Sequence, residues 1–169
     1  MPKESSKIAI VLAFIAIYVI WGSTYLLNKI AVTELPPLFI SSIRFFSASI
    51  IIFSIAKLMK SDLRINKAQL RNAAFVGSLF LVYGNGIFVW ALKYVDSGFG
   101  ALLASTQPLF VLILLRLIDE KKVKPKSIIG IVLGIIGMYL LVSQKGLSTN
   151  ENMAIGTLMI FSCVIVWSY

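Results

Sequence analysis

Long runs of apolar residues alternate with short polar connections along the whole chain. Five runs and a sixth that is still apolar at the last residue cover residues 8–28, 38–58, 73–92, 98–118, 128–143 and 153–169. A helix crosses the bilayer core with about 17 to 25 apolar residues, and only the fifth run is shorter than this. Because a segment in lipid must satisfy its own backbone hydrogen bonds, each run is predicted to be helical. The pattern predicts an all-α, polytopic helical membrane protein with five transmembrane helices and most of a sixth.

The connections between the runs are short and carry residues that end helices. Pro36 and Pro37 close the first connection, Gly98 closes the third, and Gly146 lies in the fifth. Residues 57–72 form the longest connection, which we expect to be an interfacial or solvated loop. No stretch has the composition of a separate soluble domain.

Lysine and arginine are distributed unevenly over these connections. Twelve of them lie in the N-terminal tail and in the second and fourth connections, whereas the alternate connections hold only Lys29, Lys93 and Lys145. Cytoplasmic loops of membrane proteins carry an excess of these residues. The sequence therefore predicts that the N-terminus and the even-numbered connections are cytoplasmic.

The composition agrees with a membrane protein and limits which disulfides, metal sites and cofactor sites the chain can form. The chain is 59% hydrophobic with a mean hydropathy of +0.92, whereas soluble domains are roughly 45 to 50% apolar. It has no His and a single Cys, Cys163, so we expect no disulfide within the chain, no metal site and no cofactor. The net charge of +9 is also found in nucleic-acid-binding proteins. Here the basic residues lie between apolar runs, so they are expected to orient the chain in the lipid bilayer, with no nucleic acid as a partner.

A weak internal repeat relates the first apolar run to the last. A shift of 146 residues places residues 11–23 over 157–169 and aligns Trp21 with Trp167, each of which is followed by a small residue. Five spans precede the second copy, so it enters the membrane from the opposite side. This relation is that of an inverted-topology repeat.

Several segments resemble a known family of transporters. They are Ile20-Trp21-Gly22-Ser23-Thr24-Tyr25, Leu35-Pro36-Pro37 with Ile43-Arg44-Phe45, and Ala101-Leu102-Leu103-Ala104-Ser105-Thr106-Gln107-Pro108-Leu109. Together with the five-span count and the basic second and fourth connections, they resemble the ten-helix drug/metabolite transporters with paired EamA domains. The resemblance covers essentially the whole chain, which corresponds to about half of a family member.

The resemblance implies a domain layout in which the second domain is truncated. It implies a cytoplasmic tail at 1–7, a first EamA-type five-helix domain at 8–143, an external linker at 144–152 and the start of a second EamA-type domain at 153–169. A complete second domain is the expected partner and is absent from this chain.

The resemblance also implies a function. The chain would be the N-terminal half of a secondary transporter in the plasma (inner) membrane, exporting small organic metabolites or drugs by alternating access. The alternative is a truncated membrane protein or scaffold with no activity of its own. An enzyme is not expected, because no His or acidic residue lies inside a predicted span and no Lys lies deep within one.

Arg44 is the only charged residue predicted to lie well inside a span. At 1.5 Å per residue it lies about 10 Å along its helix from the outer boundary. A charge at this depth costs at least a few kcal/mol and usually faces a cavity or a partner. Two interpretations are open. Arg44 attracts an anionic or carboxylate-bearing solute, or it is a structural residue that reaches the interface or caps carbonyls of a neighbouring helix.

The remaining candidates for a solute pathway are polar and aromatic residues of the first, third and fourth spans. They are Trp21, Ser23, Tyr25 and Asn28, then Tyr83 and Asn85, then Ser105, Gln107 and Pro108. Trp21, Tyr25 and Asn28 are spaced to share one helical face. The amides of Asn85 and Gln107 are costly in lipid unless they meet each other or a substrate.

Pro108 cannot donate a backbone hydrogen bond to Ala104, so it is expected to loosen the fourth helix. For the first span, the alternative interpretation is an aromatic belt with helix packing. For the third and fourth spans, the alternative is interhelical packing.

Overall fold

The computed structural model describes residues 7–118, 125–144 and 151–169, which are almost entirely helical. In chain order the elements are α1 (Lys7–Glu34), α2 (Pro37–Leu58), α3 (Lys67–Gly77), the π-helix η1 (Ser78–Gly86), α4 (Ile87–Ala91), α5 (Ser97–Ala104), α6 (Gln107–Leu117), α7 (Pro125–Gln144) and α8 (Glu151–Ser168). These described ranges contain no strand. The elements α3, η1 and α4 follow one another without a break, whereas a turn at Ser105 and Thr106 separates α5 from α6.

Four helical segments are long and apolar enough to cross a membrane. They are Ile8–Glu34, Pro37–Leu58, Lys67–Ala91 and Ser97–Leu117. Two shorter apolar helices among the described residues, Ser127–Gly137 and Asn152–Ser168, fall on the fifth and sixth predicted runs. The chain is an all-α, multi-pass membrane protein.

Two helices, α1 and α3, extend furthest beyond their predicted bounds. Helix α1 continues past residue 28 to Glu34, so Lys29 lies inside a helix and not in a connection. Helix α3 begins at Lys67 because Asn66 caps it. The Asn66 side chain accepts from the Gln69 amide at 2.8 Å, and the Gln69 side chain accepts from the Asn66 amide at 2.9 Å. Only the middle of the predicted loop 57–72 is therefore non-helical.

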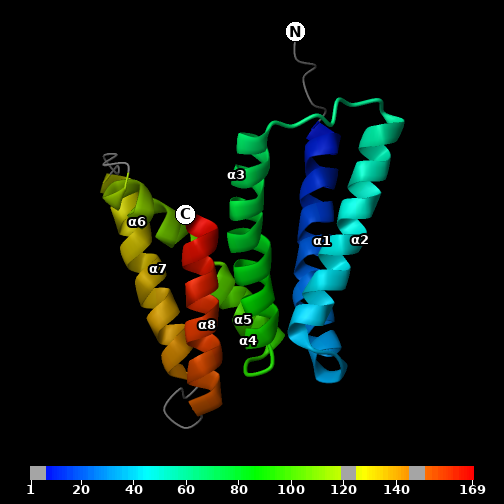
Figure 1. The fold of residues 1–169 in the computed structure, drawn as a ribbon. Helices are drawn as coiled ribbons and strands as arrows, with labels where there is room; N and C mark the ends of the chain where they lie inside the picture. Colours follow the sequence, from blue (N-terminus) through cyan, green and yellow to red (C-terminus); the bar gives the residue numbers. More distant parts are fainter. Residues whose placement is uncertain (1–6, 119–124, 145–150) are drawn as a thin grey trace.

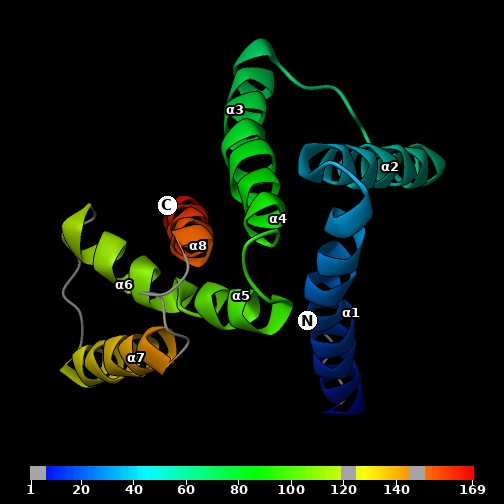
Figure 2. The same cartoon turned by 90° about the horizontal axis from the view of Figure 1, so that it is seen from below.

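The helices α1 and α2 stand at one side of the molecule, and α8 lies among α4, η1, α5 and α6 (Figures 1 and 2). Helix α7 lies on the outside, next to α6. The chain direction of α8 is opposite to that of α1 (Figure 1). Opposite directions are the relation required of two helices that form an inverted pair.

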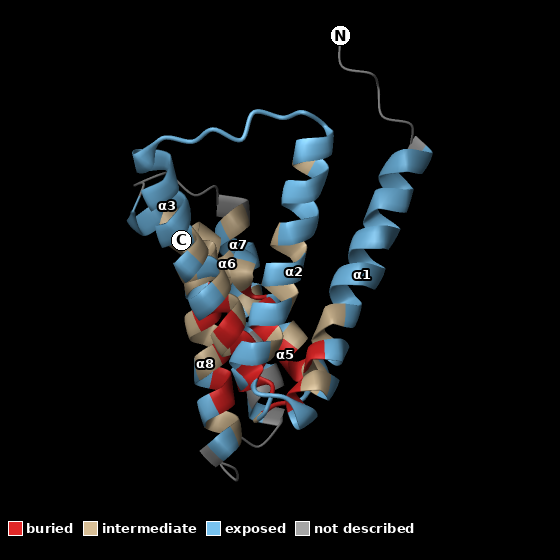
Figure 3. Cartoon of the chain, turned by 45° about the vertical axis from the view of Figure 1, so that its right-hand side comes forward, coloured by how far each residue is buried: buried red, intermediate tan, exposed pale blue. Residues whose placement is uncertain are grey.

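The buried core lies where α4 and α5 meet α8, towards one end of the helices (Figure 3). Its largest fully buried side chains are Leu92, Leu103, Ile160, Val89, Val164 and Cys163. Gly156 brings α8 close to the end of α4, since a Cβ there would lie 2.8 Å from the Tyr94 Cβ. Small residues allow helices to approach closely in lipid, where apolar character alone does not hold them together.

Candidate functional site

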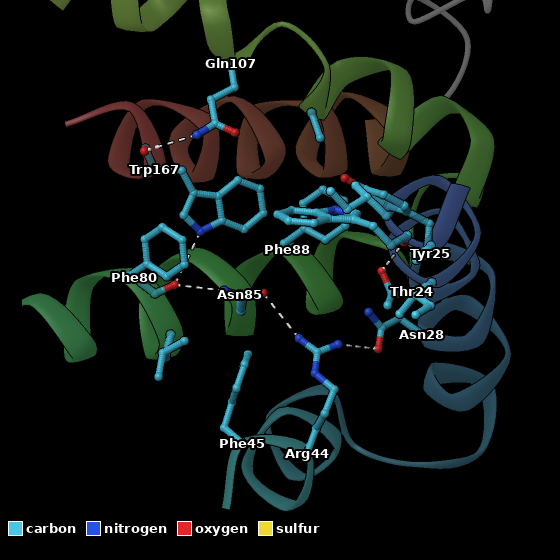
Figure 4. A pocket seen from close by; sticks show the side chains of 16 residues that line it. Thr24, Tyr25, Asn28, Arg44, Phe45, Phe80, Asn85, Phe88, Gln107 and Trp167 are labelled. Carbon is cyan, nitrogen blue, oxygen red and sulfur yellow. Dashed lines mark hydrogen bonds between the residues drawn. The ribbon is translucent and has the colours of Figure 1, made fainter. Parts of the chain in front are cut away.

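A cavity of about 550 Å³ lies between α1, α2, η1, α4 and α8 and reaches the turn between α5 and α6 (Figure 4). Six of its lining side chains are aromatic: Trp21, Tyr25, Phe45, Phe80, Phe88 and Trp167. Five more are polar: Thr24, Asn28, Arg44, Asn85 and Gln107. Small-molecule sites have volumes of roughly 300 to 1,000 Å³ and combine apolar walls with a few polar groups. The cavity matches that description.

Aromatic rings from α1, η1, α4 and α8 form a continuous row along one wall. The Tyr25 and Phe88 rings meet edge to face with centroids 5.6 Å apart, and the Phe88 and Trp167 rings lie 5.4 Å apart. Phe80 extends the row at 6.3 Å from Trp167. Contacts of this kind stabilise the ring positions. The wall therefore offers fixed, flat surfaces against which a planar solute can stack.

Arg44 reaches the cavity from α2, and two amide side chains hold it. Its Nη1 donates to Asn28 Oδ1 at 3.0 Å, and its Nη2 donates to Asn85 Oδ1 at 3.2 Å. The guanidinium carbon lies 4.6 Å from the centre of the Phe45 ring, which adds a cation–π contact. These contacts join α2 to α1 and η1 through side chains.

The π-helix η1 determines how Asn85 presents its amide. Asn85 Nδ2 donates to the Phe80 carbonyl at 3.0 Å, which leaves its oxygen towards Arg44. The Trp167 indole N–H donates to the same carbonyl at 3.3 Å. A chain of hydrogen bonds thus links Trp167, Phe80, Asn85, Arg44 and Asn28 across four elements (Figure 4). Single π-helical stretches are frequent at functional sites.

Trp167 is held in the cavity wall by a glycine and by a second pair of polar contacts. A Cβ on Gly84 would overlap the indole, lying 2.8 Å from its Cδ1 atom. Gln107 Nε2 donates to the Trp167 carbonyl at 3.2 Å. The Ser168 hydroxyl donates to the Val164 carbonyl at 2.6 Å, and its oxygen lies 3.3 Å from the Gln107 carbonyl. The end of α8 is therefore fixed against both η1 and the start of α6.

The fourth span is interrupted where the proline predicts it. Helix α5 ends at Ala104, and α6 starts at Gln107 with Pro108 in its first turn, a position where a missing N–H costs nothing. The turn directs Gln107 to the central cavity. Ser105 and Pro108 line a separate cavity of about 360 Å³ beside α7.

Six of the ten predicted pathway residues line the central cavity. They are Trp21, Tyr25, Asn28, Arg44, Asn85 and Gln107. Ser23 is exposed and donates to the Ile20 carbonyl at 2.8 Å, and Tyr83 is 42% exposed on the outside of η1. Asn85 and Gln107 take separate protein partners and do not pair with each other.

Four aromatic lining residues, Phe45, Phe80, Phe88 and Trp167, were not predicted as site residues. The repeat contained a signal for one of them, because it aligns Trp167 with Trp21, and both line the cavity. Phe80 and Phe88 lie in an apolar run in which nothing distinguishes them from lipid-facing residues. Their direction depends on the π-helix η1, which contains Phe80 and ends two residues before Phe88.

Among the described residues, Arg44 is the only charged side chain that lines the central cavity. Within the described residues, no group of three or more His, Cys, Asp or Glu side chains lies together as a metal site would require. The described lining thus offers ring faces, amides, the hydroxyls of Thr24 and Tyr25, and one positive charge. These groups can bind a small organic molecule.

A model of the EamA-like transporter family matches residues 7–143 of the chain. The uncharacterized inner membrane transporter YedA of Escherichia coli K12 is 36% identical over 158 residues, which are 93% of this chain and 50% of YedA. The uncharacterized transporter YoaV of Bacillus subtilis is 25% identical over 160 residues, 95% of this chain and 55% of YoaV.

Protein PagO of Salmonella typhimurium is 26% identical over 160 residues, 95% of this chain and 53% of PagO. The chain therefore spans about half the length of the curated relatives it matches. No solved structure matches it.

Proposed function

This chain belongs to the EamA-like transporter family, and from this membership we propose that it forms one half of a secondary transporter for small organic solutes. The observation that carries the proposal is the cavity, where six aromatic rings and a hydrogen-bonded arginine face one space inside a membrane protein. Polar residues within spans are expensive and mark solute pathways. The solute would lie between the aromatic row and Arg44.

A second EamA-type domain would supply the other half of the pathway. Secondary transporters with inverted repeats bind their solutes near the bilayer midplane, between the repeats. Trp21 and Trp167, which the repeat aligns, line the same cavity from helices of opposite direction. This geometry supports a pathway built from paired, inverted domains and opened to each side in turn.

The proposal includes a location and a direction. The protein would lie in the plasma (inner) membrane, since its relative YedA is named as an inner membrane transporter. Its N-terminus would be cytoplasmic, because twelve Lys and Arg residues lie in the tail and the even-numbered connections. Export is proposed on the resemblance to drug/metabolite transporters.

Solute binding tests the proposal on the chain itself. Of the three tryptophans, Trp21 and Trp167 line the cavity, so the Trp90→Phe variant reports on the cavity through its fluorescence. In lipid nanodiscs, neutral benzamide is expected to quench this fluorescence saturably. Quenching that rises linearly with concentration, without saturation, would contradict a binding site.

Transport is tested in a chimera in which this chain replaces the matched residues of YedA, which supplies a second domain. Radiolabelled hippurate or its neutral amide, both of which cross lipid slowly, is added to the medium around inside-out membrane vesicles. Accumulation of either solute above vesicles without the chimera is expected for an exporter. Ser105→Ala is the matched control, because Ser105 lies outside the central cavity.

A further inference from the structure

Among the residues that the structure describes, no side chain that lines the cavity neutralises the positive charge of Arg44. Its two hydrogen-bond partners, Asn28 and Asn85, are uncharged amides, and none of these described lining residues is acidic. Amide oxygens satisfy individual N–H groups but leave the net charge in place. A charge inside a membrane protein is costly, and a counter-charge, carbonyl partners or a water-filled cavity reduce that cost.

The guanidinium keeps donors available for such a counter-charge. A guanidinium carries five N–H groups, and the two hydrogen bonds to Asn28 and Asn85 use one on each terminal nitrogen. Its planar fork matches the two oxygens of a carboxylate, which it binds with parallel, charge-assisted hydrogen bonds. Phe45 packs against the guanidinium and restricts its orientation.

Aromatic rings surround the remaining space in front of Arg44. Tyr25, Phe88 and Trp167 form the row opposite it, and their ring planes are fixed by contacts with one another (Figure 4). A solute that places a carboxylate on Arg44 would extend its body along this row. A flat body gains most there, because stacking requires two planar faces.

We propose that the cavity selects planar organic anions, with the carboxylate on Arg44 and the ring against Phe88 and Trp167. This assignment rests on the proposed function, since it names the class of solute that the pathway takes. Asn28 and Asn85 act as positioning residues. They hold the guanidinium towards the cavity through uncharged oxygens and so leave its charge for the solute.

The test compares three probes that share a phenyl ring and differ in charge: benzoate is negative, benzamide is neutral and benzylammonium is positive. Binding to the Trp90→Phe chain in phosphatidylcholine nanodiscs is measured by fluorescence titration. Benzoate is expected to bind at least about tenfold more tightly than benzamide, as for a charge-assisted pair in a poorly solvated site. Benzylammonium is expected to bind more weakly than both.

Two variants test whether the preference for benzoate over benzamide depends on Arg44. Arg44→Gln is expected to lower benzoate affinity by about tenfold and to change benzamide affinity by less than about twofold. Asn28→Asp preserves the oxygen that faces Arg44 but adds a competing carboxylate, so it is expected to have the same selective effect. This second variant keeps the test available if Arg44→Gln does not fold. Ser105→Ala should bind both probes as the parent does.

The possible outcomes distinguish a failure of the proposed anion preference from a failure of the proposed binding site. Equal binding of benzoate and benzamide, tighter binding of benzylammonium, or equal losses of both probes in the two variants would overturn the anion assignment alone. Absence of saturable binding by all three probes would overturn the proposed function as well.

Discussion

The region where α8 packs against α4 and α5 and the region formed by α1 and α2 are built from similarly apolar sequences, yet they pack differently. Leu92, Leu103 and Ile160 are completely buried in the first region, whereas Phe46 and Ile52 of α2 are 68% and 65% exposed. Glycines permit the close approach of α8. Apolar character places a helix in lipid, and fit between surfaces decides whether it meets another helix.

Polar contacts join the two regions across the cavity. Lys29 on α1 donates from its Nζ to the carbonyls of Leu92 and Val95, at 2.6 and 2.9 Å. Arg44 on α2 makes the other link, through Asn85 of η1. The wall at α8 is therefore formed by close packing, whereas the wall at α1 and α2 combines packing contacts, such as that of Tyr25 with Phe88, with these hydrogen bonds.

The largest effect is expected from breaking the packed region at Gly156. In Gly156→Ala, the new Cβ would lie 2.8 Å from the Tyr94 Cβ, 2.9 Å from a Val95 methyl and 3.2 Å from the Ala91 carbonyl. None of these atoms is the free end of a flexible side chain, so α8 must shift. We expect a loss of about 1 to 3 kcal/mol in the free energy of unfolding.

The measurement is unfolding by SDS in bicelles, followed by circular dichroism. Gly22→Ala is the matched control in the other region, because nothing lies within 4 Å of its added Cβ. It should be neutral or slightly stabilising, since Ala favours helix over Gly. Equal losses in the two variants would show that the regions do not differ in packing.

A smaller effect is expected from cutting the link that Lys29 makes. Lys29→Met removes the donor to two carbonyls at the end of α4 and leaves the packed core unchanged. We expect a loss of about 1 kcal/mol, the usual net contribution of such contacts. Hydrogen exchange measured by mass spectrometry should become faster in the turn at residues 92–96.

Lys93→Met is the control for this variant, because Lys93 is exposed in the same turn. Faster exchange in both variants would attribute the effect to lost surface charge. Unchanged exchange in Lys29→Met would contradict the idea that hydrogen bonds hold α1 in place.

The sequence predicts the helices well because a bilayer requires long apolar runs. The helix class, the multi-pass architecture and the interruption at Pro108 were predicted, and the described residues agree. The end of α1 was placed too early, since Lys29 was assumed to lie outside the membrane. Its aliphatic stem and two carbonyl partners allow it to stay within the helix.

The cavity was less predictable than the helices. Side chains that are polar within a run, such as Asn28 and Asn85, stand out in the sequence, and both line the cavity. Phe80 and Phe88 do not stand out, because aromatic residues occur equally on lipid-facing surfaces. Their placement follows from the π-helix, which changes the angular spacing of side chains. No pattern of residues in the sequence predicted this π-helix.

The smallest effect is expected inside the α1–α2 region, at Ser41. This residue is 6% exposed and faces a third cavity, of about 540 Å³, between α2, α3 and η1. Its hydroxyl has no hydrogen-bond partner among the described residues. Ser41→Ala removes an unpaired polar group and breaks no hydrogen bond. It is expected to raise the unfolding free energy by up to about 1 kcal/mol.

Ser42→Ala is the neighbouring control, because the Ser42 hydroxyl is exposed and donates to the Leu38 carbonyl at 2.7 Å. Such bonds back to the preceding turn contribute little to helix stability, so its unfolding should change by less than about 0.5 kcal/mol. Both variants are unfolded under the conditions used for Gly156→Ala. If Ser41→Ala is less stable than Ser42→Ala, the Ser41 hydroxyl has a partner in the cavity, and polar contacts hold the α1–α2 region more extensively than Lys29 and Arg44 alone.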